Sequence, residues 1–181
     1  METERQLLDA ISSGDSQAMR RLYDRFSGYA MAISLRYVSE YDDARDVLQD
    51  SFVSILTSLS DFEYRGEGSL KSWISKIVTN RALDWLKEHD EVKMTDDIPE
   101  EAAEDYEPEV EKIPPDVLNW MIGRLPAGYR AVLNLYVFEQ LSHKQIAQRL
   151  GIKEATSASQ YYHAKQMLAE MIRKYISKNK I

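Results

Sequence analysis

The chain of 181 residues contains no cysteine, and it has only seven glycines and five prolines. Without cysteine, the chain forms no disulfide, no thiolate metal site and no cysteine nucleophile. The scarcity of glycine and proline disfavours a loop-rich all-β fold. No apolar run approaches the roughly 18 residues of a transmembrane helix. The charged start METERQLLDA lacks the apolar core of a signal peptide. We therefore expect a cytoplasmic protein with no membrane insertion.

The sequence also lacks the common motifs of catalysis. Its three histidines, His89, His143 and His163, are far apart and form no HExxH pattern. A P-loop, a GxSxG nucleophile motif and a GxGxxG dinucleotide motif are likewise missing. We therefore predict that the protein is not an enzyme and that it needs no cofactor or metal.

The net charge of −7 is unevenly distributed along the chain. Residues 1–87 carry a net charge of −3, residues 88–112 carry −10, and residues 113–181 carry +6. The acidic middle segment repels itself and contains Pro99 and Pro108, so it is typical of an extended, flexible linker. A simple spacer explains this composition, and a segment that mimics nucleic acid in a basic channel is the alternative. The sequence thus predicts two domains, residues 1–87 and 113–181, joined by an acidic linker.

Both predicted domains show apolar residues at spacings of three and four, which is the pattern of amphipathic helices. We therefore predict an all-α fold of two small helical domains. In the first domain a short helix ends near Gly14, and Asp15 or Ser16 caps the next helix. Ser69 is expected to cap the last helix of that domain. The predicted longer helices cover approximately residues 19–37, 42–59, 70–87, 117–125 and 127–138.

The sequence after residue 140 predicts a helix-turn-helix. Ser142 and Gln145 form a capping box, Gly151 is suited to end the first helix, and a second helix starts near Glu154. The exposed face of the second helix would present hydroxyl and amide groups to base edges, with lysines near phosphates. An ordinary polar helix face is the alternative. The candidate contacts are Lys144, Lys153, Thr156, Ser157, Ser159, Gln160, His163 and Lys165.

A second pattern typical of nucleic-acid binding spans residues 62–87, where aromatic and cationic side chains are interspersed. Aromatic rings can stack on unpaired bases while cations follow the backbone of a single strand. Gly66 and Gly68 would let the loop backbone approach an extruded base. Tryptophans at helical spacing also occur in cores, so burial of Trp73 and Trp85 is the alternative. The aromatic residues are Phe62, Tyr64, Trp73 and Trp85, and the cations are Arg65, Lys71, Lys76, Arg81 and Lys87.

Four aspartates and a glutamine lie on one predicted helix, at Asp42, Asp43, Asp46, Gln49 and Asp50. Clustered carboxylates can bind a divalent cation, but no glycine-containing calcium loop surrounds these residues. A solvated helix face is the simplest interpretation. The functional alternative that we favour is docking onto a basic protein surface, because charge complementarity directs partner choice.

Three segments occur in a distinctive order. They are DARDVLQDSFVSIL, then FEYRGEGSLKSWISKIVTNRALDWLK, and, after the acidic linker, LPAGYRAVLNLYVFEQLSHKQIAQRLGIKEATSASQ. In this order and spacing the chain resembles, over nearly its whole length, the extracytoplasmic-function (group IV) sigma factors of bacterial RNA polymerase. The resemblance implies a protein that binds core polymerase, reads a −35 element as duplex DNA and melts a −10 element. It also implies that the linker threads toward the active-site channel of the polymerase.

The resemblance further implies roles for individual positions. DARDVLQDSF resembles region 2.2, which docks on the β′ clamp helices, and residues 62–85 resemble regions 2.3 and 2.4, which contact the −10 element. The helix-turn-helix resembles region 4, which reads the −35 element, and the β flap and an anti-sigma factor are further expected partners. The implied polymerase contacts are Asp43, Asp46, Gln49, Asp50 and Phe52. The implied −10 contacts are Phe62, Arg65, Gly66, Ser69, Lys71, Trp73, Lys76, Asn80 and Arg81.

The predicted recognition helix departs from the family pattern. Ala158, Gln160 and His163 stand where family members often carry lysine or arginine, so no −35 consensus is transferred to this chain. From the residues alone, two other functions stay open. One is a stand-alone helix-turn-helix regulator with an N-terminal sensing domain, which would bind a palindromic duplex as a dimer without polymerase. The other is a helical adaptor that binds only proteins.

Overall fold

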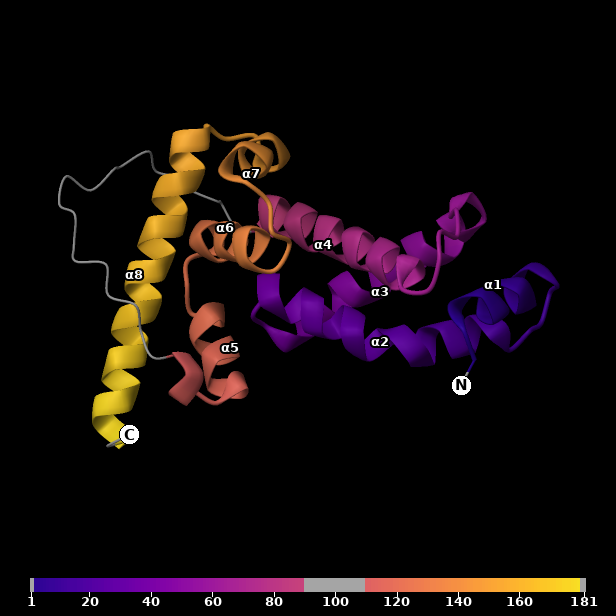
Figure 1. Ribbon diagram of the computed structural model, residues 1–181, viewed down its shortest axis with the longest axis horizontal. Coiled ribbons are helices and arrows are strands. Elements are labelled where there is room, and N and C mark those ends of the chain that lie inside the picture. The colour runs from indigo at the N-terminus through magenta and orange to yellow at the C-terminus, as the bar shows by residue number, and fades with distance from the viewer. Residues whose placement is uncertain (1, 90–109, 180–181) are drawn as a thin grey trace. The chain divides into compact units, whose positions relative to one another are not determined.

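The computed structural model describes residues 2–89 and 110–179, and within these ranges the chain is helical and has no strand. The chain divides into two compact units, Met1–His89 and Asp90–Ile181, which are described one at a time (Figure 1). The predicted all-α fold is confirmed. Most of the predicted acidic linker, residues 90–109, lies outside the described residues, and Val110–Lys112 form the short 3-10 helix η2. None of the helices in the described ranges has both the length and the apolar character that a membrane crossing requires.

The N-terminal unit is built around three long helices that pack against one another in pairs, with a shorter helix against α2 (Figure 1). The elements are α1, Glu4–Ser12; α2, Ala18–Tyr37; α3, Tyr41–Ser58; η1, Leu59–Asp61; and α4, Ser69–His89. The predicted helices agree with these boundaries to within a few residues. Fully buried side chains of the long helices include Leu22 on α2, Ile55 on α3 and Ile74 on α4. Burial of each such side chain stabilises the unit by about 1.5–3 kcal/mol relative to exposure.

Local hydrogen bonds set the first two helix starts. At α1, Thr3 Oγ1 accepts a hydrogen bond from Gln6 N, and Gln6 Oε1 accepts one from Thr3 N, which forms a capping box. Before α2, Asp15 Oδ1 accepts from Gln17 N at 2.9 Å. Asp15 therefore orders the turn ahead of α2, whereas Gln17 is the residue that flanks the helix itself.

The C-terminal unit is organised around one long helix. Its α-helices are α5, Pro115–Gly123; α6, Ala127–Val137; α7, His143–Leu150; and α8, Glu154–Asn179. Helix α8 packs against α5, α6 and α7, and α6 also contacts α7 (Figure 1). The predicted helix-turn-helix is confirmed, because Ser142 and Gln145 form the capping box and Gly151 ends α7 in the left-handed conformation with φ +70°.

Candidate nucleic-acid interface

The loop between η1 and α4 turns sharply because two of its glycines adopt positive φ. Gly66 has φ +119° and Gly68 has φ +90°, which side chains with a Cβ rarely adopt. Ser69 Oγ donates to Gly66 O at 2.6 Å and accepts from Arg65 N at 3.2 Å, which closes the turn. The prediction that Ser69 caps α4 is therefore wrong. The backbone N–H groups at the start of α4 are instead bound by the carboxylate of Glu4 from α1.

A pocket of about 410 Å³ lies beside this loop and brings five of the predicted −10 contacts together. Phe62 and Trp73 form its aromatic part, with ring centroids 5.1 Å apart and ring planes at 45°. Both side chains are half-buried, so neither ring is sealed in the core. The arrangement can accept an unpaired base by stacking. The lining residues are Asp61, Phe62, Glu63, Arg65, Ser69, Ser72, Trp73 and Lys76.

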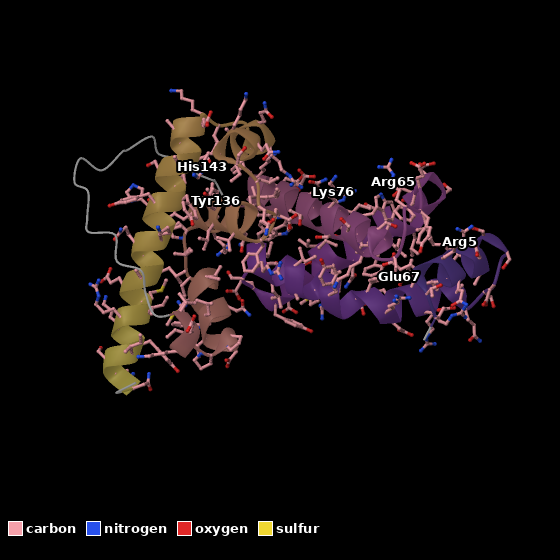
Figure 2. All side chains as sticks on the ribbon, viewed as in Figure 1. Arg5, Arg65, Glu67, Lys76, Tyr136 and His143 are labelled. Carbon is pink, nitrogen blue, oxygen red and sulfur yellow. The ribbon has the colours of Figure 1, made fainter. Side chains whose placement is uncertain are left out.

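Two cations, Arg65 and Lys76, and two carboxylates, Asp61 and Glu63, line the pocket, so its formal charges balance. Arg65 Nη2 lies 2.8 Å from Glu63 Oε2, and this hydrogen bond raises the pKa of the Arg65 guanidinium. Both side chains are 76% exposed, so water screens the pair and a phosphate group can replace Glu63 at little cost. Lys76 is exposed and lies three residues after Trp73 on α4. Figure 2 shows Arg65 at the loop and Lys76 further along α4.

Three further predicted −10 contacts on α4 lie outside the pocket. Lys71 Nζ lies 4.6 Å from the ring centroid of Tyr29, so this side chain faces α2. Arg81 Nη2 donates to Ser54 Oγ at 2.8 Å, so this side chain faces α3. Asn80 is exposed one turn beyond the pocket on the same face of α4. The predicted set therefore divides into five pocket residues, Gly66 in the loop beside them, one extension along α4, and two cations directed at neighbouring helices.

The acidic residues of α3 lie at the surface, as predicted. Asp46, Gln49 and Asp50 are exposed, and Asp43 is half-buried. Within residues 2–89 and 110–179, no ion pair engages these three aspartates, and no group of three or more acidic or histidine side chains is arranged to hold a metal ion. The unpaired carboxylates leave this face of α3 suited to a basic partner surface.

Phe52, a predicted polymerase contact, does not lie on this surface. Its side chain is 4% exposed and packs against Tyr23 of α2 with ring centroids 4.7 Å apart. Helical spacing assigns Phe52 to the apolar stripe of α3, and packing in the structure follows that stripe. An exposed apolar residue next to the acidic face is Val53, which is 62% exposed and lies one turn after Gln49 and Asp50. Sequence reasoning missed Val53, although its spacing from those two residues was a usable signal.

Four predicted −35 contacts on α8 are buried, so the expectation of an exposed hydroxyl face is wrong. Thr156, Ser157, Ser159 and Gln160 are 4%, 0%, 8% and 1% exposed, respectively. Ser157 faces α7, where its Oγ lies 3.0 Å from Nδ1 of His143. The other three each have an interaction partner within the chain.

The remaining predicted −35 contacts lie nearer the surface. Three lysines are exposed: Lys144 on α7, Lys153 just before α8, and Lys165 on α8. His163 is half-buried, and its ring stacks on Tyr129 of α6 with centroids 5.5 Å apart and planes at 10°. Of the predicted set, the lysines are therefore the groups placed for contact with phosphates.

An aromatic cluster that sequence reasoning missed holds the helix-turn-helix together. The His143 ring stacks on Tyr136 at 4.8 Å, and Tyr136 contacts Tyr161 at 4.3 Å, measured between ring centroids. Burial raises the pKa of the Tyr161 hydroxyl, and Tyr136 adds to this effect. Figure 2 shows Tyr136 and His143 close together in this unit. With the hydrogen bond between His143 Nδ1 and Ser157 Oγ, the cluster connects α6, α7 and α8.

Comparisons with known proteins identify two matching regions. The family model of Sigma-70 region 2 matches residues 22–92, and that of Sigma-70 region 4 matches residues 119–168. The ECF RNA polymerase sigma-E factor of Haemophilus influenzae is 27% identical, covering 94% of this chain and 95% of the relative. The RNA polymerase sigma-H factor of Pseudomonas aeruginosa is 25% identical, covering 92% of each chain.

Solved structures give a matching fold. The sigma factor RpoE from Bartonella quintana, in complex with the anti-sigma factor NepR, has a TM-score of 0.51 at 20% identity. The match covers 87% of this chain and 98% of that chain, and at this identity it supports the fold alone. The function rests on the two regions, which together span most of the chain in the order region 2, then region 4. The chain therefore belongs to the sigma-70 family of RNA polymerase sigma factors.

Proposed function

We propose that this protein binds core RNA polymerase and directs transcription initiation at promoters that carry a −35 and a −10 element. Membership of the sigma-70 family and the similarity to ECF sigma factors support this function for the chain as a whole. The sigma-70 family is not an enzyme family, so the polymerase performs the chemistry and this protein supplies recognition. The proposed place of action is the cytoplasm.

The pocket beside α4 is the observation that carries the −10 part of the proposal. A base extruded from the non-template strand would stack on Trp73 or Phe62, while Arg65 and Lys76 neutralise nearby phosphates. Extruding a base costs roughly a few kcal/mol, and stacking one base returns about 1–3 kcal/mol. Stacking and phosphate contacts together are therefore needed to hold the melted strand. Asn80 would extend the contact along that strand.

The exposed acidic face of α3 supports docking on the polymerase. Asp46, Gln49 and Asp50 would face basic side chains of the β′ clamp helices, and Val53 would supply an apolar centre. Such complementary charges accelerate encounter and select the partner, while apolar contacts at the centre of an interface slow dissociation. We therefore expect both the acidic residues and Val53 to contribute to the affinity for core polymerase.

The C-terminal unit is proposed to bind the −35 element as duplex DNA and to contact the β flap. Residues 113–181 carry a net charge of +6, and the exposed Lys144, Lys153 and Lys165 are candidates for phosphate contacts. Because the RpoE chain of similar fold is bound to an anti-sigma factor, we propose that an anti-sigma factor also controls this protein. Bound in this way, the sigma factor would be withheld from core polymerase.

Transcription in vitro tests the proposed function directly. Core polymerase with and without the purified full chain is given a library of bacterial genomic fragments. Discrete transcripts that appear only with the chain, from fragments that share two elements at constant spacing, are the expected result. Tight binding of a palindromic duplex by the chain alone, with no such transcripts, would instead favour a stand-alone regulator. Absence of both activities would leave a protein-binding adaptor.

A further inference from the structure

Glu4, in the first turn of α1, is buried against the loop of residues 62–68, with 2% of its surface exposed. Its Oε2 accepts hydrogen bonds from Gly68 N at 2.9 Å and Leu70 N at 3.0 Å, and its Oε1 accepts from Lys71 N at 3.2 Å. The first N–H groups of a helix have no partner within the helix and carry partial positive charge. A carboxylate, which only accepts hydrogen bonds, therefore satisfies the donors at the start of α4.

A second carboxylate ties the loop to α1 in the opposite direction. Glu67, in the loop, accepts from Glu4 N at 3.1 Å through its Oε2. Arg25 on α2 donates to Glu67 Oε1 at 3.2 Å and to Glu2 O at 2.8 Å. Helix α1 and the loop thus exchange hydrogen bonds both ways, and Arg25 fixes both partners to α2. Figure 2 shows Glu67 and Arg5 at this end of the unit.

These contacts hold the backbone that forms one part of the pocket. Arg65 and Ser69 line the pocket, and they lie on either side of Gly66, Glu67 and Gly68. Glycine permits many other backbone conformations, so Gly66 and Gly68 do not by themselves hold the turn in one conformation. The Glu4 carboxylate binds Gly68 N and Leu70 N on both sides of Ser69. The geometry of the pocket therefore depends on a residue that does not line it.

We propose that Glu4 is a positioning residue for the −10 pocket, and that its carboxylate holds the loop and the start of α4 in the geometry that receives an extruded base. This inference rests on the proposed function, because Glu4 acts through residues that are themselves proposed to contact DNA. It assigns a role in −10 recognition to α1, which contributes no side chain to the pocket.

The variant Glu4→Gln tests this role with little change in size. Its amide oxygen can accept hydrogen bonds, but its amide nitrogen is a donor and would face backbone N–H groups. Asp9→Asn is the matched control, because it removes one negative charge from an exposed position on the same helix. Val47→Ala is the second control, because it lowers the stability of the unit through a core residue of α3 that is remote in sequence from the loop.

Hydrogen exchange of the full chain measures the loop directly. In Glu4→Gln, the amides of Gly68, Leu70 and Lys71 are expected to exchange at least about tenfold faster, because hydrogen bonds to a charged acceptor have been lost. Asp9→Asn should leave these amides unchanged. Val47→Ala should change them only in proportion to its effect on the unit as a whole. Equal exchange in Glu4→Gln and wild type would overturn the proposed contact.

Promoter fragments selected by the wild-type holoenzyme from a randomised library then measure the consequence. With Glu4→Gln, open-complex formation should fall about tenfold, whereas core binding and −35 duplex binding should stay within about twofold of wild type. A Val47→Ala protein of matched thermal stability should open these promoters nearly normally. If both variants open promoters equally well, Glu4 has only a structural role and the inference fails. If the wild type selects no fragments, the proposed function fails, and hydrogen exchange still decides whether Glu4 holds the loop.

Discussion

The two predicted DNA surfaces of this protein differ in how many of their predicted contact residues are accessible. In the N-terminal unit, Phe62, Arg65 and Trp73 come from a loop and the helix that follows it, and all three line one open pocket. In the C-terminal unit, the predicted hydroxyl and amide contacts at the start of α8 are buried, and the lysines are the exposed members of the predicted set. The first surface is suited to holding a base in a shaped site, and the other is suited to contacting phosphates of a duplex.

The difference follows from the backbone on which each set lies. Successive side chains of an α-helix point about 100° apart, so a run such as residues 156–160 cannot face one partner. Within that run Ser157 faces α7, against which α8 packs. The loop of residues 62–68 has no such constraint, because Gly66 and Gly68 turn the chain with positive φ. Consecutive candidate residues therefore point to a shared site more reliably in a loop than in a packed helix.

The largest expected effect comes from Trp73→Ala. Loss of a stacked base at about 1–3 kcal/mol should reduce open-complex formation roughly 5- to 150-fold, with −35 duplex binding unchanged. Permanganate reactivity of unpaired thymines in the −10 region measures the opening. Trp85→Ala is the control, since it removes an equal ring from the same helix outside the pocket, where Trp85 stacks on His89 at 4.4 Å. An equal defect in the two variants would show that the pocket has no special role.

A smaller effect is expected from the double variant Gln49→Ala, Asp50→Ala. Loss of two exposed contacts on α3 should weaken binding of core polymerase roughly tenfold without changing thermal stability. Fluorescence titration of labelled protein with core enzyme provides the affinity. Asp24→Ala, which removes an exposed carboxylate on α2, should bind core enzyme normally. Saturating core enzyme should restore promoter opening in the double variant but not in Trp73→Ala, which separates docking from base capture.

Local features were predictable from the sequence, and contacts between distant segments were not. The capping box of Ser142 and Gln145 and the left-handed Gly151 involve neighbouring residues, so their sequence signals were sufficient. Glu4 binds amides 64 to 67 residues away, and nothing in its local sequence indicates such a contact. Ser69, which has a residue type typical of caps, instead closes the preceding turn.

The misplaced site residues have two separate causes. Phe52 belongs to the apolar stripe of α3 by its spacing, and its role as a surface contact came only from the resemblance to a family. Thr156, Ser157 and Ser159 are small and polar, and such residues occur both in cores and on surfaces, so the sequence does not indicate whether they are buried. Hydrophobic periodicity thus placed Phe52 in the core correctly, whereas it carried no information on the small polar residues.

Ser157→Ala is expected to act on stability rather than on DNA. Loss of the hydrogen bond between Ser157 Oγ and His143 Nδ1 should lower the free energy of unfolding by about 1 kcal/mol. Chemical denaturation of Ser157→Ala, His143→Ala and the double variant measures this as a coupling energy. Binding of −35 duplex at a temperature where the protein is fully folded should be unchanged. Reduced DNA binding at unchanged stability would place Ser157 on the DNA surface, which would remove the contrast between the two units.

The smallest expected effect is that of Lys144→Ala on the salt dependence of duplex binding. Each phosphate contact releases counterions, so losing one lysine contact should reduce the slope of log affinity against log salt by about 1. The loss should be similar for all duplex sequences, because a phosphate contact reads no base. Lys174→Ala is the matched control, since Lys174 is an exposed cation of the same unit that pairs with Glu170 at 2.6 Å. Affinity measured for the −35 duplex over a series of salt concentrations tests both variants. A change that depends on the −35 sequence would mean that Lys144 contacts bases, and that the C-terminal surface is also a site of specific readout.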